Sequence, residues 1–463
     1  MTSDNKEVVR EFICKICPSQ TRPNYTYFLS NLDLLFALNP EYIRKVFYFR
    51  TKGADGVSKL SIQSLKDSLS RVLSLYPILA GRLKKGESGR LKVDVNGEGI
   101  PFIEAKTNAR LEDWQDLRLC DIQQELNPKD SFIRDICKAP PIRVQVTTFS
   151  CGSIALGLSS LHILADGLST IEFVKAWGEI HRGAEVSNKP QFESMRLRAR
   201  DPPQVSILSA DEIFASCKPL VSLPSSAPVN SSIGYRTTTF RISRRMIDKC
   251  IKDVETGAFS CGPPSSFEAL SALFWRAVTR ARGVEDSSFT TYVFPVSLRG
   301  RLQPPLPKGY FGNAVILAQV TAAAKDIKSN DFSFAASLIH KRVQMVDSEF
   351  IQSAIDWMEL RLQQQHAIGV GFELTGKNLI NTSFANFPVY EIDFGWRKLD
   401  HFEFTMHEDS PVDGLLYILP SPPDAGGDNS REVKLRLRED HLERMLHDPQ
   451  FQPYFPQELS FYS

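Results

Sequence analysis

One short run holds the best candidate for acid–base chemistry in this chain. His162 ends an apolar stretch that begins at Ile154, and Asp166 and Gly167 follow it closely. A histidine at the end of a buried strand lies where core meets solvent, and its ordinary pKa of about 6.5 suits it to take a proton from a hydroxyl or an amine. Asp166 can then hold the loop that carries the histidine. A core histidine, with Asp166 capping the next helix, explains the same pattern, so this run alone leaves both interpretations open.

The sequence does not carry the motifs of several other enzyme mechanisms. The chain has no G-x-S-x-G of an esterase and no H-E-x-x-H of a zinc enzyme. Residues 371–378 approach a phosphate-binding loop, but Asn378 stands where a serine or threonine must reach magnesium. Cys14 and Cys17 form one C-x-x-C without a second pair or a nearby histidine, and the eight cysteines are expected to be free thiols. The sequence therefore predicts no metal site.

The elements around His162 determine where its ring can point. Residues 142–149 and 154–162 are predicted as two strands joined by a short connection, and the second strand is apolar enough to lie deep in a sheet. From Gly167 onward, apolar residues recur at helical spacing. We therefore expect His162 at a strand end, followed by a tight turn and a helix.

Four further stretches give a coarse reading of the remaining structure. Residues 27–49 predict strand and turn, with the turn at 30–33. Residues 62–75 predict an amphipathic helix that ends where Pro77 requires it to end. Asn96-Gly97 favours a tight hairpin between short strands, and residues 334–364 predict one long helical stretch.

The length predicts two domains, because 463 residues exceed what a single core usually serves. Residues 199–234 are rich in proline and serine and form the predicted linker. Residues 1–198 then form the N-terminal domain and residues 235–463 the C-terminal domain. Both mix strands and helices, so the predicted fold class is α/β (α+β).

Composition excludes several classes of protein. The 55 basic and 54 acidic residues leave a net charge of +1, without the basic excess that nucleic-acid binding requires. No apolar run reaches the ~18 residues of a transmembrane helix. The first residues are polar and lack the apolar core of a secretory signal, so a cytoplasmic location is expected.

A second group of residues favours the catalytic interpretation of His162. Residues 388–396 end in Asp393-Phe394-Gly395-Trp396, and with His162 to Gly167 this chain resembles the plant BAHD acyl-CoA-dependent acyltransferases, whose signatures are HxxxDG and DFGWG. Further stretches are similar to that family in the same order, and the resemblance extends from about residue 27 to 447. These stretches are residues 29–33, 76–83, 265–270, 299–302 and 309–313.

The resemblance implies two chloramphenicol-acetyltransferase-like domains, each a mixed β-sheet with helices, and a tunnel at their interface. It implies that residues from about 375 to 405 pack into the N-terminal sheet. His162 matches the general base, and Asp166 matches an aspartate that turns away from substrate toward an arginine, here Arg299 or Arg301. Asp393 completes the candidate catalytic set, although its place in the second signature implies a structural role.

The resemblance also implies the binding residues. Thr382 matches a threonine beside the oxyanion, and Phe384 stands where many relatives carry a tryptophan with a donor N–H. Ser265 and Ser266 match a position that touches coenzyme A. Acyl-CoA is then a co-substrate, and no permanently bound cofactor or metal is needed. The last glycine of DFGWG is Arg397 here, which leaves the geometry of that loop in question.

The implied activity is transfer of an acyl group from coenzyme A to an acceptor hydroxyl, by a monomer and without a covalent intermediate. Residues 172–178 are similar to members that transfer hydroxycinnamoyl groups. Two alternatives remain open from the sequence. One is N-acylation of an amine, and the other is a non-catalytic relative that binds acyl chains and assists a partner enzyme.

Overall fold

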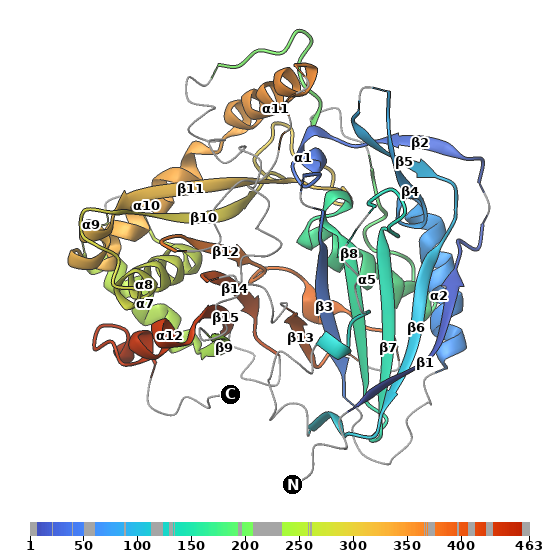
Figure 1. Ribbon diagram of the computed structural model, residues 1–463, viewed down its shortest axis with the longest axis horizontal. Helices are drawn as coiled ribbons and strands as arrows, with labels where there is room; N and C mark the ends of the chain where they lie inside the picture. Colours follow the sequence, from blue (N-terminus) through green and yellow to red (C-terminus); the bar gives the residue numbers. More distant parts are fainter. Residues whose placement is uncertain are drawn as a thin grey trace.

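A computed structural model gives the fold (Figure 1). It describes the following residues: 7–20, 22–38, 40–50, 61–87, 89–112, 124–128, 133, 135–192, 197–206, 234–257, 259, 262–364, 366, 368, 376–395, 398–405, 413–422 and 429–455. Within these ranges the strands form two six-stranded sheets and one three-stranded sheet. The two large sheets stand side by side in Figure 1, each with helices packed on it. The fold is therefore mixed α/β with two sheet-containing domains.

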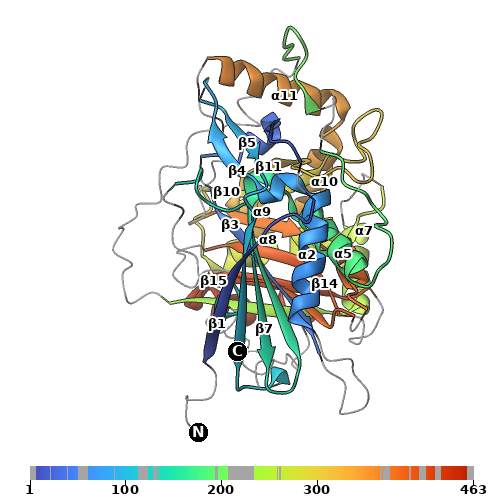
Figure 2. The same cartoon turned by 90° about the vertical axis from the view of Figure 1, so that its right-hand side faces the viewer.

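The first large sheet has the order β1-β6-β7-β8-β3-β13. All of its neighbouring strands are antiparallel except β6 and β7, which are parallel. Figure 2 shows α2 and α5 together on one side of this sheet. The bounds are β1 Val8–Ile16, β3 Tyr42–Phe49, β6 Ile100–Thr107, β7 Ile142–Phe149, β8 Ile154–Leu161, β13 His401–Phe404, α2 Ile62–Leu75 and α5 Gly167–His181.

The second large sheet has the order β11-β10-β12-β14-β15-β9. Strand β12 runs parallel to both of its neighbours, and the other pairs are antiparallel. Helices α7, α8, α10 and α12 lie on its outer side (Figure 1). The bounds are β9 Tyr235–Ile242, β10 Phe289–Ser297, β11 Val315–Ala323, β12 Leu379–Ser383, β14 Leu415–Pro420, β15 Arg431–Arg438, α7 Arg244–Thr256, α8 Ser266–Ala281, α10 Phe332–Met345 and α12 Glu439–Leu446.

The smaller elements complete the described part. A three-stranded sheet has the order β2-β5-β4. The remaining bounds are β2 Tyr25–Phe28, β4 Arg82–Lys85, β5 Leu91–Val95, α1 Asn31–Leu34, α9 Ala324–Ser329, α11 Ser348–Gln363, and the 3-10 turns η2 Pro77–Ala80, η3 His162–Leu164, η6 Val389–Glu391 and η8 Gln452–Tyr454. None of the helices in the described ranges is both long and apolar enough to cross a membrane.

Two late segments of the chain join the domains. Strand β13 follows β12 in sequence but pairs with β3, so Phe404 lies opposite Lys45 in the first sheet. Phe311 is buried in the core of the first domain, although its chain neighbours belong to the second. It packs edge-on against Tyr76, with ring centroids 5.1 Å apart. The junction between the two sheets is therefore built from both halves of the chain.

Three local predictions from the sequence were wrong. The hairpin at Asn96-Gly97 does not form, because β5 pairs with β2 and β4 while β6 pairs with β1 and β7. The expected helical stretch from 334 to 364 is two helices, α10 and α11. Asp347 begins the second one by accepting a hydrogen bond from the Phe350 N–H. Ser30 caps the short helix α1 rather than a turn, because its side chain and that of Asp33 form a capping box.

Candidate active site

His162 lies where β8 ends and faces the junction of the two sheets. Every residue of β8 is buried, whereas His162 is half-buried, and its backbone N–H donates to the carbonyl of Glu41 just before β3. Phe36 stacks on the imidazole, with ring centroids 3.8 Å apart and planes 13° apart. Among the described residues, no group hydrogen-bonds Nδ1. The stacked ring therefore fixes the plane of the imidazole without using either of its nitrogens.

Burial sets the protonation state of His162. The pKa of His162 is lowered to about 4, mainly by desolvation and to a smaller extent by the ammonium of Lys45, while the carboxylate of Asp166 opposes both. The imidazole is consequently neutral across the whole physiological range. A neutral imidazole can accept a proton, which is the state a general base needs.

Asp166 binds groups of the second domain, and its contacts join the two domains. Its carboxylate accepts from Nη1 and Nη2 of Arg299 at 2.7 and 3.0 Å, and from the backbone N–H groups of Ser169 and Ala314 at 2.9 and 3.0 Å. Burial alone would raise the pKa of Asp166, but Arg299 and these donors hold it below its ordinary value. Asp166 is thus an ionised structural group that begins α5.

The sequence left two arginines open as the partner of Asp166, and the structure separates them. Arg299 makes the ion pair and also donates from Nη2 to the Ser169 hydroxyl at 2.9 Å. Arg301 instead donates from Nη1 to the carbonyls of Val343 and Val346, at 2.9 and 3.0 Å. Arg301 therefore supports the end of α10 and is not the partner of Asp166.

Asn313 connects the backbone of His162 to Asp33 in the short helix α1. Its Nδ2 donates to the His162 carbonyl at 2.9 Å and to Oδ1 of Asp33 at 2.8 Å, and its backbone N–H donates to the same Oδ1 at 3.0 Å. The N–H and hydroxyl of Ser30 donate to the other carboxylate oxygen of Asp33. This buried chain of hydrogen bonds holds the turn that carries His162.

The opposite wall comes from the second sheet. Thr382 on β12 is half-buried and lies beside Tyr417 on β14 in the parallel register. Tyr417 stacks on Phe404 of the first sheet, with centroids 4.9 Å apart and planes 7° apart. Asn381 points to α8 on the outer side of the sheet, so its neighbour Thr382 points to the other side, toward the first domain. Phe384 follows β12 directly and lies in the core of the first domain.

Phe384 fills the space above the start of α5. It is buried, and its ring centroid is 4.3 Å from that of Phe404 and 4.8 Å from that of Phe387. A Cβ atom added at Gly167 would lie 2.8 Å from Cζ of Phe384, which is closer than van der Waals contact allows. The missing side chain at Gly167 therefore makes room for this ring.

Asp393, which the sequence placed among the catalytic candidates, lies near the end of α5 that is far from Asp166. Its Oδ1 accepts from the Gly395 N–H at 2.7 Å, and its carbonyl accepts from Nη1 of Arg182 at 2.6 Å. It packs over Gly178 near the end of α5, twelve residues beyond Asp166. A helix rises 1.5 Å per residue, which separates the two aspartates by roughly 18 Å along the helix axis. Arg397 lies outside the described residues, as do residues 207–233 of the predicted linker.

Ser265 and Ser266 begin α8, away from His162. The Ser265 hydroxyl accepts from the Glu268 N–H, and its own N–H donates to the Glu268 carboxylate, so Ser265 forms a capping box. Ser271, further along α8, accepts from Asn381 at 3.2 Å, and Asn381 is the neighbour of Thr382 on β12. The start of α8 is thereby connected to the strand that carries Thr382.

Several residues at this site escaped the sequence-based prediction. They are Asp33, Phe36, Lys45, Asn313 and Tyr417. Asp33 and Asn313 lie in stretches that carried the family resemblance, and Ser30-x-x-Asp33 is a capping-box pattern. Lys45 was detectable as a lysine that stands next to Arg44 in a strand whose other residues are aliphatic or aromatic. Nothing in the local sequence singles out Phe36 or Tyr417.

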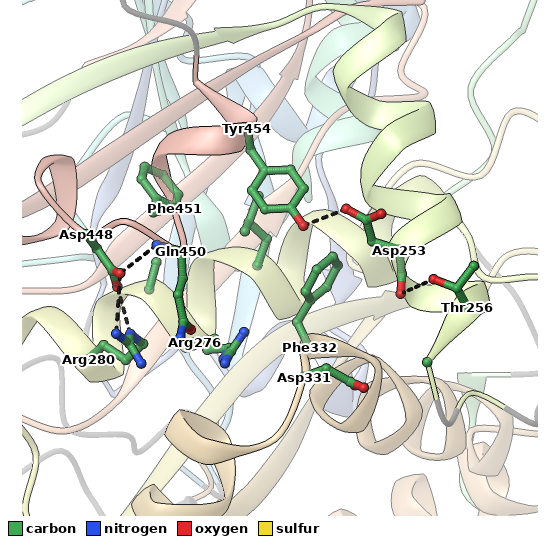
Figure 3. A pocket seen from close by; sticks show the side chains of 13 residues that line it. Asp253, Thr256, Arg276, Arg280, Asp331, Phe332, Asp448, Gln450, Phe451 and Tyr454 are labelled. Atoms are coloured by element: carbon green, nitrogen blue, oxygen red, sulfur yellow. Dashed lines mark hydrogen bonds and ion pairs between the residues drawn. The ribbon is translucent and has the colours of Figure 1, made fainter.

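A separate cleft of about 410 Å³ lies among the outer helices of the second domain (Figure 3). There Arg280 pairs with Asp448 at 2.7 Å, and the Tyr454 hydroxyl donates to Asp253 at 2.6 Å. These contacts attach the segment after α12 to α7 and α8. No residue lining this cleft belongs to either signature, so we assign it no part in the chemistry. Among the described residues, no three His, Cys, Asp or Glu side chains gather to hold a metal.

Comparison with known proteins adds three findings. A family model described as Transferase family matches residues 11–452. A hydroxycinnamoyltransferase of Narcissus pseudonarcissus is 30% identical over 92% of this chain and 95% of its own, and a rosmarinate synthase of Plectranthus scutellarioides is 32% identical over 93% and 96%. The crystal structure of F. sporotrichioides TRI101, complexed with coenzyme A and T-2, superposes with a TM-score of 0.75. It covers 92% of this chain and 98% of its own at 16% identity, and so shares the fold.

Proposed function

The chain belongs to the Transferase family, the BAHD acyltransferases that its two signatures resemble, and we propose that it transfers an acyl group from coenzyme A to an acceptor hydroxyl. The observation that carries this proposal is the position of His162. It is a neutral, half-buried imidazole at the junction of two sheets, and its loop is held by buried hydrogen bonds. This arrangement suits a base that must accept a proton without being protonated by solvent.

In the proposed reaction His162 takes the proton from the acceptor hydroxyl while the oxygen attacks the thioester carbonyl. A tetrahedral oxyanion forms and then collapses, the carbon–sulfur bond breaks, and the imidazolium returns the proton to the coenzyme A thiolate. Asp166 does not take part in these transfers, because its carboxylate is occupied by Arg299. It acts by holding the turn between β8 and α5.

The oxyanion needs a hydrogen-bond donor, and we assign this role to the hydroxyl of Thr382. Thr382 lies on the wall that faces the first domain, beside Tyr417. Phe384 carries no donor, and it packs against Phe387 and Phe404. Its proposed role is to close the wall around the reacting groups and to exclude water.

The start of α8 is the proposed site for coenzyme A, through Ser265 and Ser266. The N–H groups of the first turn of a helix attract phosphate. Ser265 is exposed and Ser266 is half-buried. Acyl-CoA enters as a co-substrate, so the proposed enzyme needs no resident cofactor. Its proposed setting is a cytoplasmic monomer, which size-exclusion chromatography and cell fractionation would test.

A hydroxycinnamoyl donor fits the walls around His162. Phe36 and Tyr417 are half-buried rings at the junction, and a planar aromatic acyl group stacks favourably on such rings. The relative named hydroxycinnamoyltransferase supports the same donor class. The neutral imidazole serves an amine acceptor by the same proton transfer, so amines form the second arm of the test.

The test is a donor-by-acceptor screen with the purified full chain. Donors are p-coumaroyl-, caffeoyl-, feruloyl- and acetyl-CoA, and acceptors are long-chain hydroxy acids, aromatic hydroxy acids, polyols and amines. Coenzyme A release is followed with a thiol reagent, and the acylated product is identified by mass. The expected result is acceptor-dependent release by the native chain and its loss in His162→Ala. Binding of acyl-CoA without release for any acceptor would instead indicate a non-catalytic relative.

A further inference from the structure

Lys45 is a lysine buried in the first sheet, on the strand next to the one that leads to His162. It lies on β3 between Leu158 of β8 and Phe404 of β13, and only 1% of its surface is exposed. Its Nζ donates to the Ser160 hydroxyl at 3.3 Å and lies 5.7 Å from the centre of the Phe404 ring. Ser160 lies near the end of β8, two residues before His162, which begins the 3-10 turn η3. A hydroxyl and an aromatic face therefore hold the ammonium beside the end of the strand that leads to His162.

No carboxylate among the described residues forms an ion pair with Lys45. The other titratable groups that face this corner have hydrogen-bonding or ionic partners, or pKa values that burial raises. Asp166 is paired with Arg299, and Asp33 receives four hydrogen bonds from Ser30 and Asn313. Burial raises the pKa of Asp33 and that of Glu41, which precedes β3. Tyr417, on the opposite wall, is a phenol whose pKa burial raises above its ordinary range.

Lys45 is therefore the main uncompensated charge beside His162. Burial lowers the pKa of Lys45 to about 7, so the ammonium is fully charged at the lower pH where His162 titrates. Two positive charges in a poorly solvated corner repel each other strongly. The repulsion destabilises the protonated form of His162, because only the imidazolium places a second positive charge beside Lys45.

We propose that Lys45 is a positioning residue for the reaction, whose buried ammonium adds to the effect of burial in disfavouring the His162 imidazolium and makes that imidazolium a readier donor to the leaving thiolate. The proposal rests on the proposed role of His162 as the base. It assigns to Lys45 no contact with substrate. Its effect is electrostatic and passes through His162.

The experiment measures His162 itself, in the absence of substrate. Histidine-labelled full-length protein is titrated by NMR, and the His162 resonance among the eight histidines is identified by its loss in His162→Ala. In Lys45→Met the His162 titration is expected to move to higher pH by at least about one pH unit, the shift that a unit charge roughly 12 Å away produces at an effective dielectric of about 20. Lys45→Gln is a second neutral variant, for use if the methionine variant does not fold.

Lys434 provides the matched control. It is also a buried lysine, with 3% of its surface exposed, but its Nζ donates to the Phe404 carbonyl at 2.9 Å and its charge acts on Glu403. Lys434→Met is expected to leave the His162 titration unchanged. A His162 titration that stays in place in both Lys45 variants, or that moves equally in Lys434→Met, overturns the proposal. If the native chain shows no turnover in the screen above but the Lys45 variants still move the His162 titration, the proposed function is refuted and the electrostatic role of Lys45 is not.

Discussion

The carboxylate of Asp166 and the guanidinium of Arg299 form a two-armed ion pair, with N–O distances of 2.7 and 3.0 Å, between the start of α5 and the loop after β10. The pair joins the first domain to the second directly behind His162. Both oxygens of Asp166 are occupied, so this aspartate cannot relay protons. Its removal is expected to act through the fold.

We predict that Asp166→Ala loses about 3–5 kcal/mol of the free energy of unfolding, because Arg299 would keep a buried charge without a partner. Chemical denaturation measures this loss. Asp166→Asn keeps the shape and part of the hydrogen bonding, so it should lose less. The double variant Asp166→Ala, Arg299→Ala should be more stable than the sum of the two single losses predicts. An Asp166→Ala protein that is fully stable and yet inactive would mean that Asp166 takes part in the chemistry.

We predict that kcat/KM for the native chain stays level as the pH falls from 7 to 5 and declines only near pH 4. Burial, with Lys45, lowers the pKa of His162 to about 4, and the base works only when it is neutral. Circular dichroism at each pH ensures that only folded protein is compared. His162→Ala should lower kcat by about 10²- to 10⁴-fold with a nearly unchanged Tm. A decline centred near pH 6.5 would show an imidazole in contact with bulk solvent.

The sequence predicted the elements that carry His162 more accurately than the surroundings of its ring. Helix α2 has the predicted bounds, and β7, β8 and α5 agree closely with prediction, because each has a regular apolar pattern and a clear end signal at Pro77 or Gly167. The predicted hairpin at Asn96-Gly97 failed for a physical reason. A local turn preference is weak, and β5 and β6 each find better partners in different sheets.

Contacts between distant segments set the limit of prediction at the site. Phe36 and Asn313 reach His162 from 126 and 151 positions away, and no local pattern encodes such distances. The family resemblance supplied Asp166 and an arginine, but it could not separate Arg299 from Arg301, which are two residues apart. It also included Asp393, whose distance from His162 follows only from its packing near the end of α5.

We predict that Thr382→Val lowers kcat with little change in KM. Valine keeps the shape of threonine and removes the hydroxyl that we assign to the oxyanion. Removal of one such donor costs roughly 2.7–4 kcal/mol in the transition state. Equal loss in kcat and kcat/KM identifies an interaction made mainly in the transition state. Steady-state kinetics with the best pair of substrates provides the measurement, and an unchanged kcat would limit Thr382 to packing.

We predict that Phe384→Trp lowers both Tm and kcat. The indole is larger than the phenyl ring, and the space next to Phe384 is available only because residue 167 is a glycine. Overpacking of this kind typically costs about 1–3 kcal/mol. Gly167→Ala should destabilise for the same reason, and Phe384→Leu in that background should restore part of the loss. A Phe384→Trp enzyme that is stable and faster would show instead that its indole N–H reaches the oxyanion.

We predict that the buried ammonium of Lys45 lowers the free energy of unfolding. Its ordinary pKa is 10.5 and burial lowers it to about 7, so between these values the unfolded chain binds one more proton at this position than the folded chain does. Stability from this group therefore rises with pH across that window and is lowest, and constant, below pH 7. Replacing a buried charge by an apolar side chain of similar size often stabilises by about 1–4 kcal/mol. Lys45→Met should accordingly unfold at a higher denaturant concentration than the native chain at pH 7, and the difference should shrink steadily toward pH 10. His162, whose titration we expect Lys45 to affect, stays neutral between pH 7 and 10, so the shrinking difference isolates Lys45. A difference that does not vary with pH would mean that Lys45 keeps its proton in the fold across this window. A lower stability of Lys45→Met at pH 7 would mean that the ammonium holds the junction together.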